Sequence, residues 1–116
     1  MGVAEMTQLR DGILSIIRHG RENAITGKAL AVALDESNDR RIRLVIRGLI
    51  REGIPIASAT DGEPRGFFIA RNQAEVKHYR ASLHSRLVED AYRLRDFTRA
   101  YQGYEYHEEP VQLPLL

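Results

Sequence analysis

Four arginines fall within ten residues of one predicted helix, and they are the side chains of this chain best suited to binding chemistry. They lie between Asn38 and Arg47: Arg40, Arg41, Arg43 and Arg47. A guanidinium group makes bidentate hydrogen bonds to guanine edges and also binds phosphate oxygens. The cluster is therefore typical of a nucleic-acid-binding surface, although charge runs often only solvate an exposed face. The chain carries seventeen basic and sixteen acidic residues, so any basic surface has to be local.

The apolar residues among these arginines predict an amphipathic helix over 38–52. Five of them are spaced by three and four and so share one face: Ile42, Val45, Ile46, Leu49 and Ile50. Asn38 is placed to cap the first turn, because its amide oxygen can accept from backbone N–H groups that lack a helical partner. Gly53 and Pro55 then end the helix and force extended structure.

Shorter patterns on either side predict the elements that hold this helix. Thr26 can cap a short apolar helix that runs to Leu34, and the polar run 35–38 separates it from the basic helix. Residues 54–56 and 67–69 predict the strands of a hairpin, joined by turn formers over 60–66. An apolar stripe over 8–19 predicts a first helix that Gly20 ends, whereas residues 4–7 are expected to fray.

This order of elements resembles the winged helix-turn-helix domains of the biotin-operon-repressor type, over roughly residues 9 to 71. The likeness rests on the spacing of Ile42, Ile46, Leu49 and Gly53, and on a hairpin that closes with a Gly-Phe-Phe-Ile run at 66–69. It implies a mainly α, α+β fold in which a three-helix core carries a β-hairpin wing. We expect the winged-helix domain to span residues 1–71. A long C-terminal amphipathic helix would follow it.

The resemblance implies that helix 38–52 and wing 54–70 bind duplex DNA. Its candidate contacts are Lys28, Asn38, Arg40, Arg41, Arg43, Leu44, Arg47 and Arg65. Those on the helix would face the groove, while Lys28 and Arg65 would contact phosphates. Such a protein would be a transcription regulator or a replication accessory factor. The alternative is a winged-helix module that docks another protein and binds no DNA, which the near-neutral net charge permits.

Residues 72–102 predict one long helix, because Asn72 can cap it and neither Gly nor Pro interrupts the segment before Gly103. Its apolar stripe is longer than a domain of this size can cover. We expect a second copy to cover it, with these residues at the dimer contact: Leu83, Leu87, Ala91, Leu94, Phe97 and Tyr101. The alternative is a helix that folds back across its own domain.

Residues 103–116 predict a flexible acidic tail that ends in an apolar peptide. The run Gln112-Leu113-Pro114-Leu115-Leu116 resembles the pentapeptide by which bacterial replication proteins bind the sliding clamp. That likeness implies binding through Gln112, Leu113, Leu115 and Leu116, with Leu116 in place of the usual phenylalanine. Alternatively, the leucines pack on the long helix.

The remaining composition argues against several other classes of protein. The chain has no cysteine and only four scattered histidines, so no metal site or other cofactor is expected. No serine has the context of an activated nucleophile, and no carboxylates pair as an acid and base, so we expect no enzyme. No segment has the length of a membrane span or the layout of a signal peptide, which predicts a cytoplasmic protein.

Overall fold

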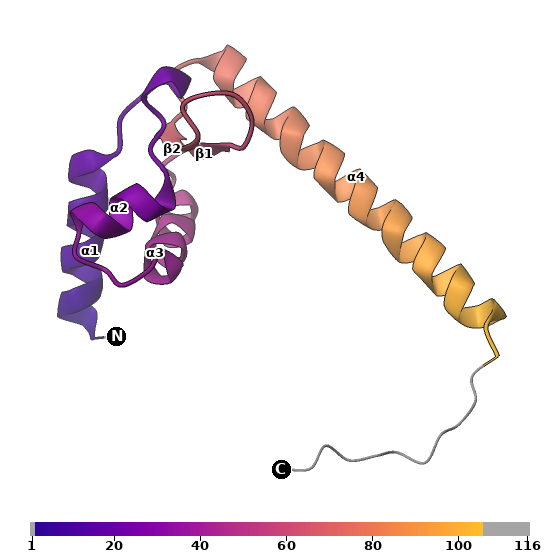
Figure 1. Ribbon diagram of the computed structural model, residues 1–116. Helices are drawn as coiled ribbons and strands as arrows, with labels where there is room; N and C mark the ends of the chain where they lie inside the picture. The colour runs from indigo at the N-terminus through magenta and orange to yellow at the C-terminus, as the bar shows by residue number, and fades with distance from the viewer. Residues whose placement is uncertain (1, 106–116) are drawn as a thin grey trace, which may run out of the picture. The chain divides into compact units, whose positions relative to one another are not determined.

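The structure, a computed structural model, describes residues 2–105 (Figure 1). The chain divides into two compact units, residues 1–81 and 82–116. The described elements, in chain order, are α1 (Val3–Ile16), the short 3-10 helix η1 (Arg21–Asn23), α2 (Gly27–Ala33), α3 (Arg40–Arg51), β1 (Ile56–Ala59), β2 (Gly66–Ile69) and α4 (Gln73–Gly103). The protein is mainly helical with a two-stranded antiparallel sheet, which confirms the predicted α+β class at this level.

Helix α1 begins earlier than the sequence pattern predicts. It starts at Val3 and ends at Ile16, so the expectation of a frayed segment over 4–7 and of a helix over 8–19 was wrong. The first turn is held because the Thr7 hydroxyl donates to the carbonyl oxygen of Val3 (3.0 Å) and Glu5 pairs with Arg41 of α3 (3.3 Å). The last residues are lost to the helix because residues 18–20 instead hydrogen-bond to strand β2.

Helices α2 and α3 are separated by the polar run that the sequence indicates. Thr26 caps α2 as predicted, since its hydroxyl oxygen accepts from the backbone N–H of Ala29 (3.0 Å). Helix α3 starts at Arg40, two residues after the predicted start at Asn38. The Asn38 amide oxygen accepts from the N–H of Arg40 (3.0 Å), so it closes the turn around Asp39, the residue at the N-cap position.

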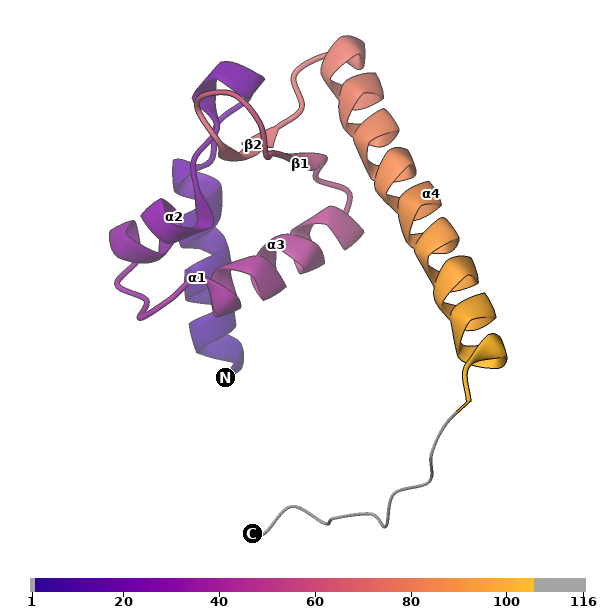
Figure 2. The ribbon, with the colours of Figure 1, turned by 45° about the vertical axis from the view of Figure 1, so that its right-hand side comes forward.

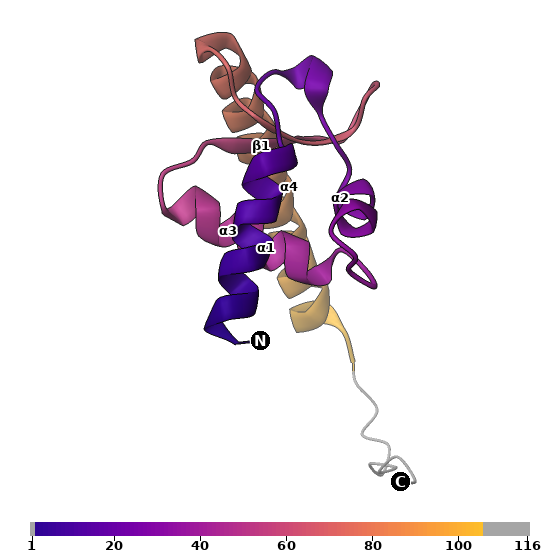
Figure 3. The same cartoon turned by 90° about the vertical axis from the view of Figure 1, so that its left-hand side faces the viewer.

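The core lies where α1, α2 and α3 meet. Its fully buried side chains come from all three helices: Ile13, Leu30, Ile42 and Leu49. In Figures 2 and 3 the three helices gather together, and the hairpin lies beside the end of α1 that leads into η1. Of the five residues predicted for the apolar face of α3, four pack inward: Ile42, Val45, Ile46 and Leu49. Ile50 was wrongly assigned to this face and is 45% exposed, and the face opposite the buried one is exposed as well.

The hairpin is joined to the helical core by backbone hydrogen bonds from residues on both sides of η1. Strands β1 and β2 pair in the register Ile56↔Ile69, and Arg18, Gly20 and Ile25 hydrogen-bond to the other edge of β2. Ile25 and Phe67 exchange both backbone hydrogen bonds, at 2.9 and 2.7 Å. Gly66 has φ +119°, and a Cβ there would lie 2.1 Å from the carbonyl oxygen of Ile25, so this approach requires glycine.

The beginning of α4 belongs to the first unit. Asn72 caps it as predicted, because its side-chain oxygen accepts from the N–H of Glu75 (3.0 Å). Tyr79 packs against a small cluster of the sheet formed by Ala57, Ala59 and Phe68. From Leu83 to the last described residue every side chain is exposed. Across residues 2–105, no helix is both long and apolar enough to cross a membrane.

Candidate nucleic-acid interface

Helix α3 presents a cationic stripe on the side opposite its buried face. Arg40, Leu44, Arg47 and Arg51 follow one another at spacings of four, three and four, which places them in line along a helix, and all four are exposed. The helix carries five arginines and no acidic residue between its first and last positions. The charge of this helix is therefore far from the near-neutral balance of the whole chain.

Three arginines of this stripe carry uncompensated charge. Arg40, Arg47 and Arg51 make no ion pair with another residue of the described range 2–105, and neither does Lys28 of α2. Arg51 was not among the residues predicted from the sequence. Its spacing of four from Arg47 on the predicted helix would have placed it on the same face.

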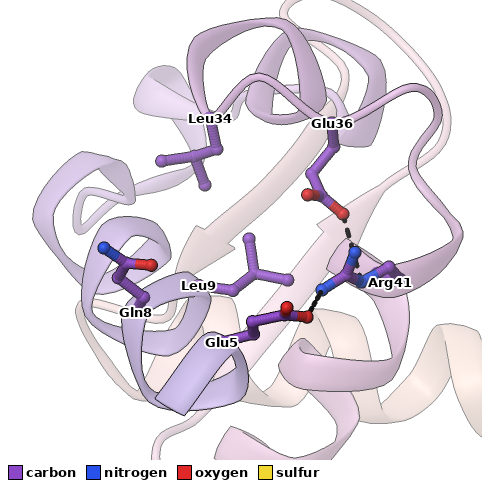
Figure 4. A pocket seen from close by; sticks show the side chains of 6 residues that line it. All are labelled: Glu5, Gln8, Leu9, Leu34, Glu36 and Arg41. Carbon is purple, nitrogen blue, oxygen red and sulfur yellow. Dashed lines mark hydrogen bonds and ion pairs between the residues drawn. The ribbon is translucent and has the colours of Figure 1, made fainter. Parts of the chain in front are cut away.

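Arg41 lies beside the stripe and pairs with two acidic side chains. Its guanidinium group lies between Glu36 (3.4 Å) and Glu5 of α1 (3.3 Å), as Figure 4 shows. Its Nε atom is buried and has no hydrogen-bond partner within bonding geometry among the described residues. These side chains border a pocket of about 340 Å³ that Leu9 and Leu34 also line. With two carboxylates beside it, the Arg41 guanidinium group joins α3 to α1, and its predicted contact with DNA stays a prediction.

Arg43 connects the first turn of α3 to the hairpin. Its Nε donates to Asp39 (2.8 Å), and the guanidinium carbon lies 5.4 Å from the centre of the Phe67 ring. A cation over an aromatic face is attracted to it, so this contact and the ion pair together fix the side chain. Arg43 remains 60% exposed, with Asp39 as its ion-pair partner.

The turn of the hairpin is held by an arginine from η1. The guanidinium group of Arg21 donates to the carbonyl oxygens of Asp61 (2.6 Å) and Pro64. Arg65, predicted at the tip, is exposed and donates to the carbonyl oxygen of Gly62 (3.3 Å). Its nearest carboxylate, on Glu63, is 3.9 Å away, a loose ion pair between two exposed side chains. The Arg65 guanidinium group is therefore exposed to solvent on a loop that Arg21 holds in place.

The other predicted residues on this side lie at the turn between α2 and α3. Lys28 and Asn38 line one pocket of about 290 Å³ together with Asp39. Leu44 lies elsewhere, in an apolar pocket of about 190 Å³ between α1 and α3 that Val3 and Met6 also line. The structure thus brings Lys28 close to the start of α3. Leu44, the apolar member of the stripe, is 57% exposed and also borders the pocket beside α1.

The carboxylates with altered pKa values lie outside the stripe. Backbone hydrogen bonds from Arg21 and Arg71 lower the pKa of Glu75, and hydrogen bonding to Arg10 lowers the pKa of Glu52. The Glu22 carboxylate accepts a hydrogen bond from its own backbone N–H, which is the larger cause of its lowered pKa. A hydrogen bond from the Arg71 side chain is the second cause. Each acid is committed to a structural contact, so none of the three neutralises Arg40, Arg47 or Arg51.

The predicted dimer contact and the predicted clamp motif differ in what the structure describes. Leu83, Leu87, Ala91, Leu94, Phe97 and Tyr101 all lie on α4 and are exposed. Gln112, Leu113, Leu115 and Leu116 lie outside the described residues, so the clamp motif stays a prediction. Within residues 2–105 no three His, Asp or Glu side chains are grouped so that they could hold a metal ion.

A scan against protein-family models, a search of curated proteins and a search of solved structures each find no match to this chain. Its function is therefore inferred from the side chains themselves.

Proposed function

We propose that residues 1–81 form a winged helix-turn-helix domain that binds duplex DNA, with α3 in the major groove and the hairpin as the wing. The observation that carries the proposal is the stripe of α3, whose three arginines make no ion pair within residues 2–105. The stripe arginines have no carboxylate partner within the described residues. The neighbouring Arg41 and Arg43 each have at least one. A surface that only needed solubility would not separate its charges in this way, because mixed charges solvate a face equally well.

The dimensions and chemistry of α3 are consistent with groove binding. Twelve residues span about 18 Å at 1.5 Å per residue, and a major groove about 12 Å wide admits one helix. The stripe would supply both bidentate hydrogen bonds to guanine and contacts to phosphate. Two further cations would contact phosphates of the DNA backbone. They are Lys28 in the first turn of α2 and Arg65 in the hairpin loop.

The direct test is charge reversal on the stripe. Fluorescence anisotropy of a labelled random duplex is measured with the intact chain and with the Arg47→Glu/Arg51→Glu variant. Affinity should fall at least tenfold, because two attractive contacts become repulsive. The matched control is Arg80→Glu/Arg99→Glu, which makes the same charge change on exposed positions of α4 and should retain most of the binding. Equal losses in the two variants would show nonspecific attraction and contradict the proposal.

A protein-docking function is the second candidate, and the pocket between α1 and α3 favours it. Val3, Met6 and Leu44 expose apolar surface around that pocket, at 84%, 47% and 57%. An apolar peptide side chain would fit there, and its binding would depend little on salt. Leu44→Ser should abolish such docking while leaving the salt-dependent affinity for a random duplex within a factor of two or so, since phosphate contacts supply that affinity.

We further propose, from the sequence alone, that residues 112–116 recruit a bacterial sliding clamp, which would make the protein a replication accessory factor. The test is surface capture of the clamp by the intact chain and by the Gln112→Ala/Leu115→Ala variant. Capture by the intact chain and its loss in the variant would support the proposal, while Val111→Ala serves as the matched control. An intact chain that does not bind would favour a regulator that acts through DNA alone.

A further inference from the structure

The loop that joins β1 to β2, residues 60–65, buries none of its residues. Five of the six are exposed, and the paired part of the hairpin ends where Ala59 faces Gly66. Within the loop, Arg65 donates to the carbonyl oxygen of Gly62 (3.3 Å). A loop with no buried side chain keeps one position only if other contacts hold it, because apolar burial does not.

Arg21 of η1 supplies the hydrogen bonds that join this loop to another element within residues 2–105. Its Nη2 atom donates to the carbonyl oxygen of Asp61 (2.6 Å), and its Nη1 atom donates to that of Pro64. The two carbonyls lie three residues apart, so one planar guanidinium group spans the turn between them. Figures 1 and 2 show this loop beside the turn that follows α1.

The backbone of Arg21 is itself fixed by β2 and by the first turn of α4. Gly20, before it, donates to a carbonyl oxygen of β2 (2.9 Å), and the N–H of Arg21 donates to the carboxylate of Glu75 (2.9 Å). Glu22, after it, accepts a hydrogen bond from Arg71 (3.1 Å). The guanidinium group therefore reaches the loop from a backbone that is held on both sides.

We propose that Arg21 is a positioning residue of the wing, which fixes the loop so that Arg65 contacts a phosphate of bound DNA. The inference rests on the proposed DNA-binding function. Arg65 directly follows Pro64, whose carbonyl oxygen Arg21 binds, and its side chain is 60% exposed. A loop that is ordered before binding loses less conformational entropy on the DNA, so its phosphate contact adds more affinity.

The charge of Arg21 offers a competing account of the same side chain. Arg21 makes no ion pair with another described residue, and the loop carries two acids beside Arg65, Asp61 and Glu63. An arginine that only offset those acids would also aid DNA binding, without fixing the loop. Lysine separates the two accounts, because it keeps the charge but lacks the planar fork that spans both carbonyls.

The test is a double-mutant cycle on the affinity for a labelled random duplex at low salt. The four proteins are the intact chain, Arg21→Lys, Arg65→Ala and the double variant. Arg21→Lys should weaken binding by about threefold or more, but by less than about 1.5-fold when residue 65 is already alanine. A merely structural role would lower the melting temperature without this coupling to Arg65.

The matched control is Arg10→Lys, which makes the same exchange at an arginine that joins α1 to Glu52 far from the loop. Its affinity should stay within about twofold of the intact chain, since phosphate contacts are kept. A readout without DNA is the NMR order parameter of the backbone amides in the loop. It should fall from about 0.85 towards 0.6 in Arg21→Lys and stay unchanged in Arg10→Lys.

Three outcomes would overturn the inference while leaving DNA binding intact. An Arg21→Lys variant that binds like the intact chain would show that the charge suffices. Additive losses in the double variant would show that Arg21 acts apart from Arg65, and unchanged order parameters would show that the loop does not depend on Arg21. An intact chain that binds no duplex at low salt would instead overturn the proposed function, and this inference with it.

Discussion

Helices α3 and α4 are both rich in arginine, yet they arrange their charged and apolar residues differently. In α3 four apolar residues are buried on one face, and the arginines lie on the other faces without an acid among them. In α4 no residue is fully buried, and Glu89, Asp90 and Asp96 are interspersed with the arginines. A helix whose own domain covers its apolar face can present a surface of one charge, which suits a polyanion. Helix α4 instead exposes its apolar side chains beyond residue 82 among charges of both signs.

Truncating one leucine in each helix to alanine should have the largest effect of the tests that compare α3 with α4. Leu49→Ala removes a side chain of α3 that is 1% exposed, so the free energy of unfolding should fall by about 2–5 kcal/mol. Leu94→Ala, at a position 68% exposed, should lower it by less than about 0.5 kcal/mol when urea denaturation is followed on dilute protein. Similar losses at the two positions would mean that α4 contributes to the same core as α3.

Two glycines sharpen the contrast between the packed hairpin and the exposed side of α3. Gly66→Ala should destabilise the protein by about 1–3 kcal/mol, because it combines a left-handed backbone with a contact on the carbonyl of Ile25.

Gly48→Ala should stabilise the protein by about 0.5–1 kcal/mol, since nothing lies within 4 Å of the added atom and the site is within a helix. Thermal melts measure both, and a Gly66→Ala variant as stable as the parent would contradict the close approach of Gly66 to the backbone of Ile25.

The cap of α2 gives a smaller effect. Thr26→Ala removes the side-chain oxygen that accepts from the N–H of Ala29, and the free energy of unfolding should fall by about 1 kcal/mol. Ser37→Ala, an exposed site in the following turn, serves as the control and should change it little. If the two variants melt alike, α2 does not depend on this cap, and the position of Lys28 would be set by packing alone.

The pH dependence of stability should differ between the two parts of α4, because Glu75 lies in the part that belongs to the first unit. Hydrogen bonds from Arg21 and Arg71 lower its pKa in the folded protein. The stabilisation is therefore complete above the unfolded pKa of about 4.3 and is lost as the pH falls through the folded pKa. Glu75→Gln should reduce the loss of stability that acid causes, whereas Glu89→Gln, on the exposed part of α4, should not. The measurement is the urea midpoint at about pH 7 and pH 3.

Local patterns allowed the sequence to predict most of the helices and the hairpin. The cap at Thr26, the stop at Gly53 and the inward face of α3 each depend on residues a few positions apart, and each is confirmed. The start of α1 was missed because Val3 and Glu5 gain their order from contacts with later residues. A sequence pattern does not show that Glu5 meets an arginine thirty-six positions away.

The candidate site could be predicted less completely for the same reason. Arg41 and Arg43 have the same residue type and nearly the same position as Arg40, but only their distant or turn-related partners show that their charges are matched. Arg51, in contrast, is predictable from its spacing of four from Arg47. The anchoring of the hairpin by Arg21 depends on residues forty positions away and carried no local signal.

The central claim is that the unpaired arginines of α3 bind phosphate and base edges of duplex DNA. The most direct measurement is the salt dependence of affinity for a labelled random duplex, compared among the intact chain and the Arg40→Ala, Arg47→Ala and Arg41→Ala variants. Removing Arg40 or Arg47 should reduce the slope of log affinity against log salt by about 0.9 each if it contacts a phosphate, and Arg41→Ala should leave the slope unchanged. No binding at low salt, or equal slopes in all four proteins, would contradict the claim.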